Sequence, residues 1–279
     1  MPAAEPSHIA LPALAAGEPD TLSALRRAVN AVTAPRVGEE ARLGLGVASL
    51  DRALSGGLAL GGLALGALHE VGPAAPRDGG AATAFATALA VLALREGGQA
   101  IWIRPDFVAA EAGELYGPGL ALMGLPLERL VILRVPRPRD GLWAMEEALQ
   151  CRAAGAVVTE LMGDDADVTA TRRLTLAAGS GGGLGLILRH QPCPAANAAM
   201  TRWEVASACG ARDGFGGLAQ PAFAVSLVKN RHGPTGQWRL SWDHHERAFV
   251  PASFAALPRP VAAAAFDRSP RPQRLARAG

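Results

Sequence analysis

The sequence predicts an α/β protein with a mainly parallel central sheet flanked by helices. Short apolar runs typical of buried strands lie at 100–103, 155–160 and 184–190. Helix-like segments alternate with these runs, and a glycine-containing turn at 72–79 joins an earlier strand to the first core helix. Alternation of this kind is typical of a parallel sheet that is covered on both faces.

Three segments are expected to form the core helices. The stretch 81–95 is uncharged up to its end, and it is shorter than the ~18–20 residues that cross a bilayer, so we expect a core helix and no membrane segment. A helix at 141–154 would place four residues in one stripe along its surface: Leu142, Met145, Leu149 and Arg152. A helix at 168–178 precedes the glycine run 179–183, which we expect to be linker or turn.

The turn at 72–79 has the frame of a phosphate-binding loop but lacks its lysine. Such a loop needs glycines for close backbone approach, a lysine for the outer phosphates, and a hydroxyl for magnesium. The frame positions are Gly72, Pro73, Arg77, Asp78 and Gly79. Lys229 is the only lysine of the chain, so no insertion can bring another into register. We expect Asp78 to face phosphate with like charge.

Around this turn the chain resembles the RecA/RadA recombinase core. The phrases Ser49-Leu50-Asp51, Gly56-Gly57-Leu58 and His69-Glu70 are similar to the segment that leads into the recombinase loop. The resemblance makes Glu160 the counterpart of the magnesium-associated aspartate and Asp106 that of the water-activating glutamate.

Towards the carboxyl end, the strand-like segment 225–231 is similar to the recombinase strand that ends in a Lys-Asn-Lys phrase. The resemblance therefore makes Lys229 and Arg231 candidates for contacts between protomers or with a partner. Connections are short at the two places where RecA keeps its DNA-binding loops. With the closing phrase at 236–243, this combination most resembles the ImuA family, over roughly residues 42–250.

The resemblance to the ImuA family implies a role in damage-induced mutagenesis. Its members are RecA-like, SulA-related accessory proteins encoded with ImuB and a DnaE-type error-prone polymerase, and their setting is translesion synthesis in the SOS response. The expected partners are an ImuB-like protein, the polymerase and RecA, with direct DNA contact left open. In the recombinase family an amino-terminal helix packs on the next protomer, so the resemblance also allows self-association or partner docking through such a helix.

Three functions of different classes stay open. The first is a non-catalytic scaffold, the second is a RecA-like ATPase or DNA-binding protein with an atypical loop, and the third is a SulA-like inhibitor of cell division. Phosphoryl transfer depends on positioned charge, so the missing lysine and hydroxyl argue against ATP hydrolysis. We therefore expect no catalytic residue and no cofactor. No residue supports the third function, and the gene neighbourhood discriminates among the three.

Composition favours a cytoplasmic protein without a metal site. The net charge of +2 gives no strong field for nucleic acid over the body of the chain. Three cysteines, Cys151, Cys193 and Cys209, lack zinc-ligand spacing and fit a reducing compartment.

The predicted domains are an extension at 1–38, the core at 39–250, and a tail at 251–279. The extension contains a short amphipathic helix that begins near Asp20 or Thr21 and that packs on the core or docks elsewhere. The tail is rich in proline and arginine and is expected to be disordered. It binds DNA phosphates, folds on a partner, or has no function. Its candidate contacts are Phe254, Phe266, Arg268, Arg271 and Arg274.

Overall fold

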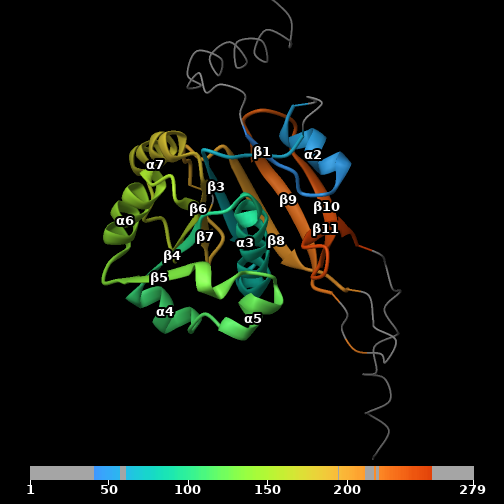
Figure 1. The fold of residues 1–279 in the computed structure, drawn as a ribbon, viewed down its shortest axis with the longest axis horizontal. Coiled ribbons are helices and arrows are strands. Elements are labelled where there is room, and N and C mark those ends of the chain that lie inside the picture. Colours follow the sequence, from blue (N-terminus) through green and yellow to red (C-terminus); the bar gives the residue numbers. More distant parts are fainter. Residues whose placement is uncertain (1–40, 57–60, 194, 211–216, 218–219, 253–279) are drawn as a thin grey trace, which may run out of the picture. The chain divides into compact units, whose positions relative to one another are not determined.

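The computed structural model describes residues 41–252, except for 57–60, 194, 211–216 and 218–219 (Figure 1). Two predicted segments lie outside the described residues: the amino-terminal extension with its helix, and the tail with its candidate contacts Phe254, Phe266, Arg268, Arg271 and Arg274. No helix within the described ranges has the length and apolar character that a membrane crossing requires.

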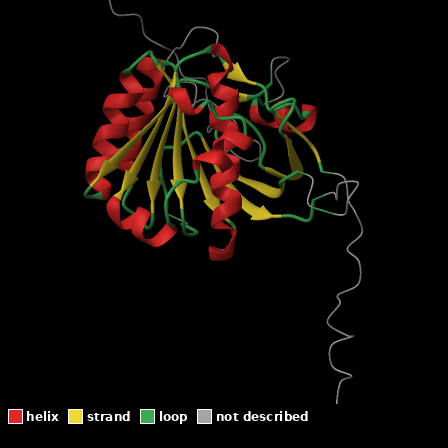
Figure 2. Ribbon diagram, turned by 60° about the horizontal axis from the view of Figure 1, so that its bottom comes forward, coloured by secondary structure: helices red, strands yellow, loops and turns green. Residues whose placement is uncertain are grey.

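A large twisted sheet forms the centre of the fold (Figure 2). Its strands are β3 (Ala67–Pro73), β4 (Gln99–Pro105), β5 (Leu130–Val135), β6 (Ala154–Leu161), β7 (Leu184–Arg189), β8 (Thr201–Ser207), β9 (Ala222–Asn230), β10 (Gly236–Asp243) and β11 (Ala248–Pro251). They are ordered β11-β10-β9-β8-β3-β7-β6-β4-β5. The pairings from β8 to β5 are parallel, and those from β8 to β11 are antiparallel. The predicted mainly parallel sheet is confirmed.

Helices cover both faces of this sheet, as predicted (Figure 1). They are α2 (Ala48–Leu54), α3 (Gly79–Ala93), α4 (Asp106–Ala112), α5 (Gly117–Leu122), α6 (Pro138–Gln150) and α7 (Val168–Gly181). α3 packs against β3, β6, β7 and β8 on one face, whereas α6 and α7 pack on the other. A small antiparallel pair, β1 (Arg42–Leu43) with β2 (Leu63–Ala64), precedes the main sheet.

The core beneath α3 is built around an aromatic cluster. Phe85 of α3 is fully buried, and its ring centroid lies 5.6 Å from Trp203 and 5.2 Å from Phe249. The three side chains come from α3, β8 and β11, so the cluster joins the parallel and antiparallel halves of the sheet. Tilted aromatic pairs at this separation stabilise a core beyond the effect of their buried area.

The glycine run at 179–183 is a close-packing feature: its first three residues belong to α7, and the expected turn is confined to Gly182 and Gly183. α7 is capped by Asp167, which accepts from the amide of Ala170 at 2.6 Å, and it continues to Gly181. It ends at Gly182, whose φ of 83° is the left-handed conformation that favours glycine. A Cβ at Gly181 would collide with the backbone at the end of α6, and one at Gly183 with the backbone at the start of β6.

Other boundaries also differ from those predicted. α6 begins at Pro138 and ends at Gln150, so Arg152 lies beyond the helix and not on its stripe. The sequence reading did not identify β5, β11, α4 or α5. Gly72 and Pro73 were expected to begin the loop. They form the end of β3 instead, so this strand is two residues longer than expected.

Candidate functional site

The turn at 72–79 joins β3 to α3, as the sequence predicts. A 3₁₀ turn at Pro76–Asp78 follows the strand, and Gly79 is the first residue of α3. Glu160 lies near the end of β6, and Asp106 directly follows the neighbouring strand β4. The structure therefore places Glu160 and Asp106 at the carboxyl ends of two neighbouring strands.

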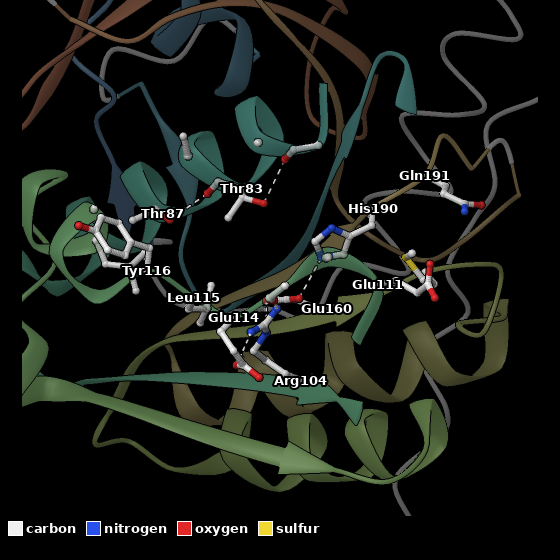
Figure 3. Close-up of a pocket in the computed structure, with 18 of the residues that line it drawn as sticks. Thr83, Thr87, Arg104, Glu111, Glu114, Leu115, Tyr116, Glu160, His190 and Gln191 are labelled. Atoms are coloured by element: carbon white, nitrogen blue, oxygen red, sulfur yellow. Dashed lines mark hydrogen bonds and ion pairs between the residues drawn. The ribbon is translucent and has the colours of Figure 1, made fainter. Parts of the chain in front are cut away.

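A cavity of about 630 Å³ lies beside the amino end of α3 (Figure 3). One wall is formed by α3, with Thr83 and Thr87, and another by the segment between α4 and α5. Residues from the ends of β4, β6 and β7 complete it, namely Arg104, Glu160, Met162, His190 and Gln191. Its volume lies in the range typical of small-ligand sites, roughly 300–1,000 Å³.

Glu160 is almost fully buried, and both of its carboxylate oxygens are engaged. Oε1 accepts from the indole Nε1 of Trp102 at 2.5 Å and lies 2.8 Å from Nε of Arg104, while Oε2 accepts from Nε2 of His190 at 2.9 Å. Burial raises the pKa of Glu160, but the hydrogen bond from His190 and the charge of Arg104 outweigh it and hold the pKa below its ordinary value. This carboxylate is therefore held ionised by the protein itself.

Arg104 extends this cluster into a chain of alternating charges. It donates to the carbonyl of Gly113 at 2.7 Å and to Glu114 at 3.2 Å. Glu114 accepts in turn from Arg134 of β5 at 2.5 Å, and Arg134 lies 3.2 Å from Asp106. Asp106 is therefore the exposed end of the chain and does not line the cavity.

Asp78 does not face the mouth of the turn, so the expectation that it would repel phosphate there was wrong. Its side chain is buried and accepts from the amide of Ser207 at 3.1 Å and from the Ser207 hydroxyl at 2.9 Å. These bonds, above all the one from the backbone, lower the pKa of Asp78. Arg77 is exposed, and a Cβ at Gly79 would meet open space.

A second buried cluster is centred on Glu70, which lies on the face of the sheet opposite Glu160. Residues alternate along a strand: Glu70 shares a face with Leu68, which packs with α6 and α7, whereas Glu160 shares a face with Val158, which packs with α3. Glu70 pairs with Arg189 of β7 through Oε1. Its Oε2 accepts from Arg202 of β8 at 2.6 Å and also from Asn197.

Lys229 adjoins this second cluster. Its ammonium donates to the main-chain carbonyl of Asn197 at 2.7 Å and to the side-chain oxygen of Asn197 at 3.1 Å. Burial, together with the charges of Arg231 and Arg202, lowers the pKa of Lys229 to about 8. Arg231 follows the end of β9 at the surface. Their predicted roles in contacts with another chain stay predictions.

Comparison with known proteins identifies the family. No family model matches the chain. Curated ImuA proteins from two strains of Caulobacter vibrioides, NA1000 / CB15N and ATCC 19089 / CIP 103742 / CB 15, are each 34% identical to it over 212 residues. The match covers 71% of this chain and 82% of each relative. The chain belongs to the ImuA family. The family resemblance predicted from its sequence phrases is confirmed.

In this ImuA-family chain, sequence reasoning missed the partners that hold Glu160. Trp102 and Arg104 are two residues apart in a largely apolar strand. Because side chains alternate between the faces of a strand, both lie on the same face of β4. A charged residue in such a run is a detectable signal for a buried ion pair. His190, directly after β7, is a hydrogen-bonded residue whose Nε2 lies 2.9 Å from Oε2 of Glu160. Among the described residues, no three histidine, cysteine or acidic side chains are grouped as a metal site.

Proposed function

We propose that the protein is a non-catalytic, RecA-like accessory factor of damage-induced mutagenesis. In this proposal it supports translesion synthesis through contacts with an ImuB-like protein and a DnaE-type error-prone polymerase. Membership of the ImuA family supports the pathway. The observation that carries the non-catalytic part is the engagement of Glu160 by Trp102, Arg104 and His190.

The order of elements around the turn supports a RecA-like core with a degenerate phosphate loop. A parallel strand, a turn and a buried helix follow one another at β3, 72–79 and α3, which is the setting of a phosphate loop. The turn ends in Arg77, Asp78 and Gly79 where a working loop has its lysine and hydroxyl. Asp78 serves instead to join the turn to β8.

Glu160 is poorly suited to a magnesium-associated role. A carboxylate that binds Mg²⁺ or its waters must offer oxygen lone pairs to the metal. Here one oxygen already accepts a hydrogen bond from Trp102 and the other one from His190, and Arg104 places a permanent positive charge 2.8 Å away. Binding of a divalent cation would require breaking these contacts and bringing two cationic groups together.

The charge of the cavity also disfavours a nucleoside triphosphate. Glu111, Glu114 and Glu160 line it, and Arg104 is the arginine among its lining residues. A nucleotide triphosphate carries several negative charges, and like charges a few ångströms apart repel strongly in a partly buried site. The helix amino end alone offers a smaller, partial positive charge.

Nucleotide binding is tested by calorimetry with Mg²⁺-ATP, and hydrolysis by phosphate release. We expect no tight binding and no hydrolysis above background, because the loop has no lysine and Glu160 is engaged. Glu160→Ala and exposed Arg77→Ala serve as paired variants. A micromolar affinity in the wild-type chain that Glu160→Ala abolishes would overturn the non-catalytic proposal.

The cellular role is tested by deleting the gene and measuring mutation after ultraviolet damage. We expect fewer induced mutations and ordinary growth, with recovery on complementation by the wild-type chain and by Arg77→Ala. Normal induced mutation in the deletion strain would contradict the mutagenesis role.

The partner contact is tested by pulldown with the ImuB-like protein. We expect removal of 253–279 to weaken association, because the basic and aromatic residues of the tail permit docking on a partner. This truncation keeps β11, which ends at Pro251, so a loss of binding is not a loss of the sheet. Unchanged binding would exclude the tail as the contact.

A further inference from the structure

The edge strand β5 presents an uncovered apolar surface. It is the last strand of the sheet on its side, with β4 as its neighbour. Three successive side chains are exposed: Val131 by 51%, Ile132 by 48% and Leu133 by 39%. Exposed apolar side chains that are contiguous along an edge strand mark an interaction surface.

The edge lacks the devices that normally prevent strand pairing. Natural edges carry proline, bulges or outward charges. β5 has no proline, and its pairing with β4 runs in unbroken register from Leu130 to Val135. Its one charged residue, Arg134, is drawn to Glu114 and Asp106 of its own chain. The outer backbone groups of β5 are therefore arranged to receive another strand.

We propose that β5 pairs with β5 of a second copy of this chain, antiparallel across a two-fold axis at Ile132. In an antiparallel ladder, two opposed residues point their backbone N–H and C=O groups either both towards the partner strand or both away from it. A pairing with two-fold symmetry must therefore oppose one residue to its own copy, with the axis between the two. An axis at Ile132 places Ile132 opposite itself and Val131 opposite Leu133. The two central sheets then form one continuous sheet.

Side chains on both faces of β5 agree with this register. Val131 and Leu133 share the face of Ile101 and Ile103 that α6 covers, so they meet as apolar pairs on that face. Ile132 is on the opposite face and meets its own copy. An axis shifted to Leu133 would oppose Ile132 to Arg134 and lose this match.

Charge at the two ends of β5 favours a second copy over an unrelated strand. Glu128 lies just before β5, and Arg137 lies just after it; both are exposed. Antiparallel pairing about Ile132 places Glu128 opposite Pro136 of the second copy, one residue before Arg137, and symmetry repeats this arrangement at the other end. An arbitrary apolar strand would not satisfy both ends.

The register is tested by cysteine crosslinking in full-length chain whose three cysteines, Cys151, Cys193 and Cys209, are changed to serine. Ile132→Cys places two thiols across the axis, with Cα atoms about 4.5–5.5 Å apart, within disulfide reach. We expect a disulfide-linked dimer on non-reducing gels. Arg134→Cys would separate the thiols by roughly four strand residues, about 14 Å, and should not crosslink. No crosslink at position 132, or equal crosslinking at both positions, would overturn the proposal.

Self-association is tested by light scattering and sedimentation. We expect a dimer at micromolar concentration, and at least tenfold weaker association for Ile132→Lys. Leu176→Lys, at an exposed apolar site of α7, is the matched control and should remain dimeric. Glu128→Arg should weaken association and Glu128→Arg with Arg137→Glu should restore it. A monomeric wild-type chain, or a dimer insensitive to Ile132→Lys, would overturn the proposal without bearing on the lack of ATP hydrolysis.

Discussion

Glu70 and Glu160 are two buried carboxylates on opposite faces of one sheet, each only 1% exposed. Each pairs with an arginine from a neighbouring parallel strand, Arg189 on β7 for Glu70 and Arg104 on β4 for Glu160. They differ in their surroundings: Glu160 borders the cavity of about 630 Å³, whereas the cavity beside Glu70 is about 20 Å³.

The difference comes from what covers each carboxylate. Asn197 bonds to Glu70 directly, and the carbonyl of Ala195 accepts from Arg202, so the segment between β7 and β8 closes that cluster. On the cavity side, His190 contacts Glu160, and Glu160 itself lines the cavity. A closed ionic cluster has no solvent to replace a lost partner, whereas one beside a cavity does. Loss of charge should therefore cost more at Glu70 than at Glu160.

The largest expected effect is that of Glu70→Gln. The change leaves Arg189 and Arg202 without their shared carboxylate in a site with almost no room for water. Breaking a buried ion pair on one side costs about 3–5 kcal/mol of folding free energy. Urea denaturation measures it, and Glu147→Gln, at an exposed position of α6, is the control, with a change of at most about 0.5 kcal/mol. A loss no larger than that of the control would contradict the structural role of Glu70.

Glu160→Gln should cost less, about 1–3 kcal/mol, because solvent in the cavity can reach the groups left behind. Arg104 also keeps its bonds to Gly113 and Glu114. If this variant proves more destabilising than Glu70→Gln, the contrast between the two clusters fails.

The same variant tests the charge state of Glu160. Since its pKa is lowered from the ordinary value of 4.5, the unfolded chain binds more protons than the folded one as the pH falls below that value. The stability that Glu160 contributes is present above this value and is lost as the pH falls through the folded pKa. The gap in unfolding free energy between wild type and Glu160→Gln should therefore narrow in acid, and a constant gap would contradict the assignment.

Local patterns predicted much of the fold. The apolar strand at 155–160, the uncharged helix after the turn and the turn itself all follow from residues near each other in the sequence. β5 escaped prediction because its short apolar run is interrupted by Arg134 and has no alternation of polar and apolar residues. The extension of α7 into the glycine run at 179–183 was not predicted, because these glycines are needed for close contact with elements that are distant in the sequence.

The candidate site was less accessible to sequence reasoning. The sequence identified Glu160 as a candidate site residue. Its ion pair with Arg104 depends on the pairing of β4 with β6, which are more than fifty residues apart in the chain. The inward orientation of the Asp78 side chain likewise depends on Ser207, which belongs to a strand distant in the sequence. Such contacts are set by strand order and register, which one sequence does not specify.

The smallest expected effect concerns Lys229, at the border of the closed cluster. Burial and the charges of Arg231 and Arg202 lower its pKa from 10.5 to about 8. Between these values the unfolded chain binds more protons than the folded one, so this group makes stability rise with pH. The side chain is half-buried and solvent screens it, so the rise should be on the order of 1 kcal/mol, and Lys229→Met should remove it.

Because Lys229 is the only lysine of the chain, its titration is visible without assignment. In protein labelled with ¹³C at lysine, the single Cε resonance should titrate with a midpoint near pH 8. Glu70→Gln removes a nearby negative charge that raises this pKa, so it should move the midpoint lower. Glu160→Gln, on the other face of the sheet, should leave it unchanged. A midpoint near 10.5 in the wild-type chain would show that Lys229 is solvated, and that the cluster around Glu70 is more open than its contacts indicate.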